Sequence, residues 1–216
     1  MLKPANLIRA EALPLTGETQ SLAEQLGSAV GLSGGEAMHA ELPVGRIDSL
    51  STLKDFLRHY QATHLIPLEL PAIVRAQILT SAGKSRELIA LDRALAGEPV
   101  LRELAGASRR LGQRQLRRLR PLRDHRTVQS YLRAVESGEA QGWHTLTYGL
   151  TLAVYSLPLR QGLSQYARQT TWGFIQAARR SVGFSETEGE QLLAELSRAW
   201  PPAIEATLAA NTNPWP

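Results

Sequence analysis

The segment from 159 to 200 constrains the fold more than any other part of the chain, because it predicts two helices that meet at a tight joint. In its first half, apolar and small residues recur at steps of three and four, which places them on one helical face. Gly183 can close this helix in the left-handed conformation, and Phe184 can fold back against it. Ser185 and Glu188 have the spacing of a capping box, which predicts the start of the second helix.

The rest of the chain also predicts helices. Leucine, alanine, glutamine, glutamate and arginine are abundant, and alternating β-branched runs are missing. We therefore expect an all-α, single-domain bundle of about eight to ten helices joined by short loops. Residues 49–210 are expected to form the bundle, after an N-terminal segment (1–48) with a short helix and loops, and before an extended tail (211–216).

Proline, glycine and small polar residues predict where these helices begin and end. Ser49 or Ser51 is expected to cap a helix that runs through Tyr60, and Pro67 and Pro71 are expected to bracket a break before the next one. Further helix starts and stops are expected at Ser85, Gly97, Pro99, Pro121, Thr127, Gly138, Trp143, Pro158 and the pair Pro201-Pro202.

The composition excludes several kinds of chemistry. The 216 residues include no cysteine, which removes disulfides, thiolate catalysis and sulfur-ligated metals. No apolar run approaches the ~20 residues of a membrane helix, and the N-terminus does not read as a signal peptide, so a cytoplasmic protein is expected. No phosphate-binding glycine loop or nucleophile elbow is found, so no catalytic or cofactor-binding residue is predicted. No tight metal site is expected from the five histidines, which do not form helical i, i+4 pairs: His39, His59, His64, His125 and His144.

Arginine is concentrated between Arg109 and Arg126, where Asp124 is the acidic residue that opposes it. Such a stretch could bind phosphates, so a basic α-helical nucleic-acid-binding protein is the alternative function. We favour a solvated helix face or a docking surface for an acidic protein, because no aromatic residue is interleaved to stack on bases.

Two shorter motifs lie on expected helices: Leu111, Gly112 and Arg114 in one, and His144, Tyr148 and Gly149 in the other. A glycine inside a helix costs about 1 kcal/mol relative to alanine, so Gly112 and Gly149 indicate close approach between helices. His144 and Tyr148 could form an acid/base pair. A buried polar contact is favoured, because no carboxylate or nucleophile lies close to them in sequence.

These motifs, together with the run from Ser185 to Leu193, resemble the urease accessory protein F (UreF) family. The resemblance extends from about Ile47 to Leu208 and is strongest after Arg109. The chain departs from the family pattern at Gly183, where proline is usual, and in the N-terminal signature, where an aromatic residue is absent.

The resemblance implies a non-enzymatic scaffold of urease maturation. It implies a homodimer that binds the D/H-class accessory protein and recruits the G-class nickel GTPase, so that nickel reaches apo-urease. No tightly bound cofactor is expected, because the partner complex handles the nickel, although a transient nickel path along carboxylates, amides or waters stays open. The resemblance places partner or dimer contacts at Tyr166, Arg168, Arg180, Ser185 and Gly189, and a structural motif at Leu111, Gly112, Arg114, His144, Tyr148 and Gly149.

Overall fold

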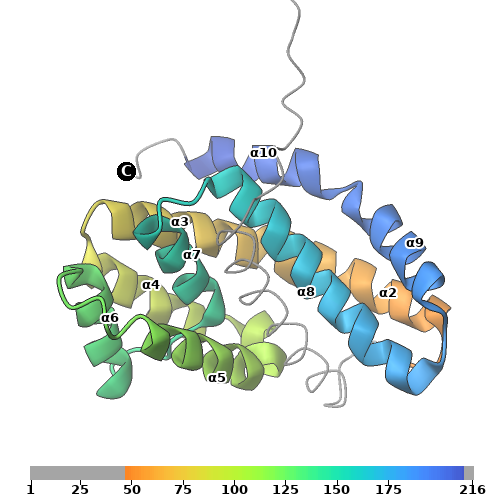
Figure 1. Cartoon of the computed structure of the whole chain (residues 1–216), viewed down its shortest axis with the longest axis horizontal. Coiled ribbons are helices and arrows are strands. Elements are labelled where there is room, and N and C mark those ends of the chain that lie inside the picture. The colour runs from red at the N-terminus through yellow and green to blue at the C-terminus, as the bar shows by residue number, and fades with distance from the viewer. Residues whose placement is uncertain (1–46, 212–216) are drawn as a thin grey trace, which may run out of the picture.

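The computed structural model describes residues 47–211, except for the side chains of Glu103, Arg180 and Asn211. All regular secondary structure in this range is helical, which confirms the all-α class (Figure 1). The elements are α2 (Leu50–Tyr60), η1 (Gln61–Glu69), α3 (Leu70–Ser81), α4 (Ser85–Ala96), η2 (Pro99–Leu101), α5 (Arg102–Arg118), α6 (Arg126–Glu136), α7 (His144–Val154), α8 (Leu159–Val182), α9 (Glu186–Ser197) and α10 (Trp200–Asn211). The predictions for residues 1–46 and 212–216 lie outside the described residues.

The predicted break at Pro67 is wrong, because the chain stays helical from α2 through η1 into α3. η1 is a π-helix, and at its end the N–H of Leu70 donates to the carbonyl of Leu65, five residues back. Proline cannot donate to the α-helical ladder, and the wider π turn accommodates this missing bond. The described chain has seven helical segments rather than the predicted eight to ten, if α2–η1–α3, η2–α5 and α9–α10 are each counted as one segment.

Two predicted helix boundaries also differ. α6 begins after His125, and Thr127, the expected cap, is inside the helix and buried. α9 ends at Ser197, before the two prolines at 201–202, which lie instead in the first turn of α10. Proline is tolerated there because the first N–H groups of a helix have no intrahelical acceptor.

The joint between α8 and α9 is formed as predicted. Gly183 has a φ of 80°, and its N–H donates to the carbonyl of Arg179 at 3.1 Å. The backbone N–H of Glu188 donates to Ser185 Oγ at 3.2 Å, and the backbone N–H of Ser185 donates to Glu188 Oε2 at 2.8 Å. These bonds satisfy backbone groups at both helix ends. Phe184 is half-buried against the core, and α9 folds back along α8 (Figure 1).

Two hydrophobic clusters fill the bundle. The first lies mainly among α2, α8, α9 and α10, and the second mainly among α4, α5 and α6. α3 and α7 pack against each other between the clusters and contribute to both. Ile73 and Tyr148 belong to the first cluster, whereas Ala76 and Leu150 belong to the second. Among the described helices, none combines the length and apolar character needed to cross a bilayer.

Candidate functional site

The residues predicted by resemblance to contact partners lie along α8 and at the start of α9. Arg168 and Ser185 are exposed, and only the backbone of Arg180 is described. Tyr166 is 1% exposed and Gly189 is buried, so both lie beneath the surface that this helical pair presents. The structure therefore leaves Arg168 and Ser185 as the predicted contact residues whose side chains are known to reach solvent.

Gly112 and Gly149 mark close backbone approach, as the sequence predicts. A Cβ built on Gly112 would lie 2.6 Å from the backbone N of His144. A Cβ on Gly149 would lie 2.8 Å from the Cβ of Ala76 and closer still to the carbonyl of Ile73. These distances are shorter than van der Waals contact, so a side chain at either position requires the backbone to move.

We expect Gly112→Ala to lower the free energy of unfolding by about 2 kcal/mol or more, because the atoms it meets belong to the backbone of 142–144. Gly106→Ala in the same helix is the matched control, since its Cβ would meet only the Arg110 side chain, at 3.5 Å. This control should be neutral or stabilise by up to about 1 kcal/mol. Urea unfolding measures both variants, and equal stabilities would contradict the close approach at Gly112.

A buried aromatic cluster connects α7 with α8. The His144 ring stacks on the Tyr166 ring with 5.8 Å between centroids, and Tyr148 meets Tyr166 edge-on at 5.0 Å. The Tyr148 hydroxyl donates to the carbonyl of Gly162 at 3.0 Å. His144 and Tyr148 are 1% and 0% exposed, and their ring centroids are 6.0 Å apart. The two rings therefore lie together in the buried packing between α7 and α8, and the polar character expected of this contact stays a prediction.

Glu69, which the sequence did not single out, lies against this cluster. Its Oε2 accepts hydrogen bonds from the Tyr60 hydroxyl at 2.6 Å and from the Tyr166 hydroxyl at 3.2 Å. Burial raises the pKa of Glu69 to about 7, although the two hydroxyls lower it by hydrogen bonding to the carboxylate. Burial, with the adjacent carboxylate, raises the pKa of both tyrosines well above the ordinary value. The tyrosines therefore remain donors, and the buried acid changes its charge near neutral pH.

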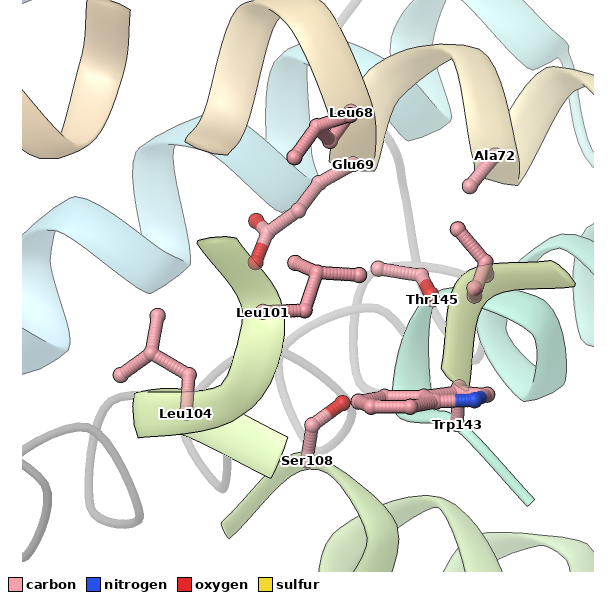
Figure 2. Close-up of a pocket in the computed structure, with 9 residues that line it drawn as sticks. Leu68, Glu69, Ala72, Leu101, Leu104, Ser108, Trp143 and Thr145 are labelled. Atoms are coloured by element: carbon pink, nitrogen blue, oxygen red, sulfur yellow. The ribbon is translucent and has the colours of Figure 1, made fainter. Parts of the chain in front are cut away.

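A small pocket lies between Glu69 and the segment that precedes α7. Figure 2 shows the Glu69 carboxylate directed toward Leu101 and Leu104, with the Ser108 hydroxyl close to the edge of the Trp143 ring. The cavity has a volume of about 10 Å³, which is room for about one water molecule. This pocket is too small for a substrate-sized molecule.

A second buried carboxylate, Asp92 in α4, holds the segment before α7. Its Oδ1 accepts from the backbone N–H of Gln141 at 2.5 Å, and its Oδ2 accepts from the N–H of Gly142 at 3.0 Å and from the Tyr131 hydroxyl at 2.6 Å. The Trp143 indole N–H donates to the Asp92 carbonyl at 3.1 Å. Asp92 is fully buried, so these bonds replace the water that a carboxylate would otherwise bind.

Within residues 47–211, no three histidine, aspartate or glutamate side chains gather in an arrangement that could hold a metal ion. The remaining predicted residues lie on α5, where Leu111 is buried and Arg114 is exposed. The described part of the chain thus combines a tightly packed helical interior with exposed side chains at two of the positions expected to meet partners, Arg168 and Ser185.

These features define a helical protein whose predicted sites lie on helix surfaces and in the packing beneath them. The chain belongs to the UreF family: the family model matches residues 47–197, which confirms the resemblance read from the sequence. It is also 27% identical over 114 residues to the urease accessory protein UreF of Paenarthrobacter aurescens (strain TC1). That alignment covers 53% of this chain and 51% of the relative, so the chain spans about half the length of the curated relative it matches.

Proposed function

We propose that this protein is a non-enzymatic urease accessory protein that bridges the D/H-class accessory protein and the G-class GTPase during nickel insertion into apo-urease. The observation that carries the proposal is the family match, which extends from residue 47, just before α2, to the end of α9 at Ser197.

The proposed mechanism is presentation of partner proteins on a rigid surface. A scaffold that holds two partners makes the second binding event effectively intramolecular, which raises affinity without new contacts. The capped joint between α8 and α9 supports this role, because it fixes the angle between two helices that carry predicted contact residues. In this proposal the protein acts as a cytoplasmic homodimer, and the nickel is handled by the complex rather than by a tightly bound cofactor of this chain.

The proposal predicts that the full chain co-purifies with the D/H-class and G-class proteins when the three are expressed together. Arg168→Glu is expected to weaken retention of the partners at least tenfold, because it reverses a charge on the exposed face of α8. Arg86→Glu, an equally exposed change on α4, is the matched control and should leave retention unchanged.

Two results would contradict the proposal at different levels. If the unmodified chain retains neither partner at low salt, the accessory role itself fails. If the chain retains both partners and the Arg168 and Arg86 variants behave alike, the placement of the contact on α8 fails while the accessory role stands.

A further inference from the structure

The outward face of α5 is strongly basic. α5 runs along the edge of the bundle opposite α10 (Figure 1). Its sequence contains one acidic residue, Glu103. Five of its arginines are exposed: Arg102, Arg110, Arg114, Arg117 and Arg118. Several of them are three or four residues apart, so they share one side of the helix.

Several arginines on other elements form ion pairs with glutamates outside their own helix. These ion pairs include Arg58–Glu195 at 2.8 Å, Arg93–Glu139 at 2.7 Å, Arg160–Glu205 at 2.8 Å and Arg179–Glu186 at 3.3 Å. Among the residues that the structure describes, Arg114, Arg117 and Arg118 form no such pair. Positive charge therefore accumulates on this face.

The helix dipole explains only part of this charge. Cations stabilise the last turn of a helix, which accounts for Arg117 and Arg118. The effect falls off within one turn, so it does not account for Arg102 at the start of α5. Like charges four residues apart, as at Arg114 and Arg118, destabilise an isolated helix. The face thus carries more positive charge than its own helix requires.

A surface pocket lies at the N-terminal end of the same helix. It has a volume of about 160 Å³ and is lined by Ala96, Glu98, Arg102, Ala105, Arg109 and Trp143. Arg109 lies 5.8 Å from the Trp143 ring centroid and donates to Gln141 Oε1 at 2.7 Å, so its guanidinium is held in place.

This combination favours a folded protein over a nucleic acid as the occupant. A protein side chain can enter the pocket and serve as an anchor within a charged rim. A single-stranded nucleic acid would need exposed aromatic rings on which to stack its bases. Trp143, the aromatic residue of the pocket, is only 4% exposed.

We propose that the exposed face of α5, from Arg102 to Arg118, docks an acidic surface of a protein partner. This inference rests on the proposed function, because the partner is taken to be one of the accessory proteins of the complex. Opposite charge on the partner accelerates encounter and fixes its orientation, and the pocket beside Arg102 receives one of its side chains.

The test uses a triple variant of the full chain, Arg114→Gln, Arg117→Gln and Arg118→Gln. Its matched control removes three exposed cations elsewhere: Lys84→Gln, Arg86→Gln and Arg198→Gln. Binding of the purified D/H-class and G-class proteins is measured at about 50 mM and about 500 mM salt. We expect the α5 variant to bind one of them at least tenfold more weakly at low salt, with the difference shrinking at high salt. The control should stay within twofold of the unmodified chain.

Other outcomes overturn the inference. If the unmodified chain binds both partners and the α5 variant binds them equally well, the docking surface is wrong while the accessory role stands. If the unmodified chain binds neither partner, the proposed function fails and the docking surface with it. The inference is also wrong if the α5 variant loses binding only to a labelled RNA oligonucleotide. Thermal unfolding checks that the variants fold. If the triple variant unfolds at a lower temperature than the unmodified chain, the single variant Arg114→Gln replaces it and is expected to weaken binding at least twofold.

Discussion

Asp92→Ala is expected to lower the free energy of unfolding by about 3 kcal/mol or more, which is a large share of the total stability of a domain. The substitution leaves the Tyr131 hydroxyl and the backbone N–H groups of Gln141 and Gly142 without their acceptor. Each buried donor without a partner costs about 1–3 kcal/mol, and the lost carboxylate also leaves a cavity. The segment that leads into α7 should loosen, because these bonds attach it to α4.

Two further variants make this prediction sharp. Asp92→Asn keeps the shape and one acceptor oxygen, so its stability should lie between those of the unmodified protein and Asp92→Ala. Asp124→Ala removes an exposed carboxylate and is expected to change stability by less than about 0.5 kcal/mol. Urea unfolding followed by circular dichroism gives the three values. The proposed role of Asp92 is wrong if its alanine variant is as stable as the Asp124 variant.

Glu69→Gln is expected to remove a large part of the pH dependence of stability. The pKa of Glu69 rises from 4.5, its ordinary value, to about 7 in the folded protein, so the folded state binds more protons between these two values. The stability contributed by the neutral acid is therefore complete below about pH 4.5 and is lost as the pH rises through about 7. The shift corresponds to about 3 kcal/mol over this range.

The measurement compares urea unfolding of the unmodified protein and Glu69→Gln at several pH values between about 5 and about 8. Near pH 5 the two proteins should be similarly stable, because glutamine resembles the neutral acid and can still accept a bond from Tyr60 or Tyr166. Near pH 8 the variant should be more stable by up to about 3 kcal/mol. Glu87→Gln, at an exposed position, is the control whose pH profile should follow that of the unmodified protein. Parallel profiles for all three proteins would show that the pKa of Glu69 is not raised in the folded state.

Local features of the fold could be predicted from the sequence because their signals lie within a few residues. The αL glycine Gly183 and the capping box of Ser185 and Glu188 each depend on backbone groups of the same turn. Gly112 was recognisable because glycine inside a helix is costly unless something approaches closely. The break predicted at Pro67 was wrong, since the rule assumes α-helical hydrogen bonding and the chain uses a π turn instead.

The buried carboxylates were missed because their partners are distant in sequence. Glu69 bonds to Tyr166, 97 residues away, and Asp92 bonds to Tyr131, 39 residues away. One signal was present for Asp92: it is placed on the buried stripe of α4 between Leu88 and Leu95, where a charged residue needs a partner. No comparable signal marked Glu69, which lay inside the expected break.

Surface function is harder to derive than packing. The family resemblance assigns contacts to Arg168 and Ser185, and the structure places both on the surface. Neither periodicity nor capping distinguishes a solvated arginine from one that meets another protein, because both occupy the same helical face. On α5 the proposed docking surface rests on two features that the sequence does not give, the ion pairs of arginines elsewhere and the pocket beside Trp143.

The π-helix η1 also restricts how this chain can change in length. A residue gained or lost between 61 and 69 would rotate all of α3 by about 100° relative to α2. Ile73 and Ala76 would then turn away from Gly149, and larger side chains of α3 would face the place where only small atoms fit against this glycine. Substitutions in this stretch can be absorbed one side chain at a time, whereas insertions and deletions would misalign both halves of the bundle at once.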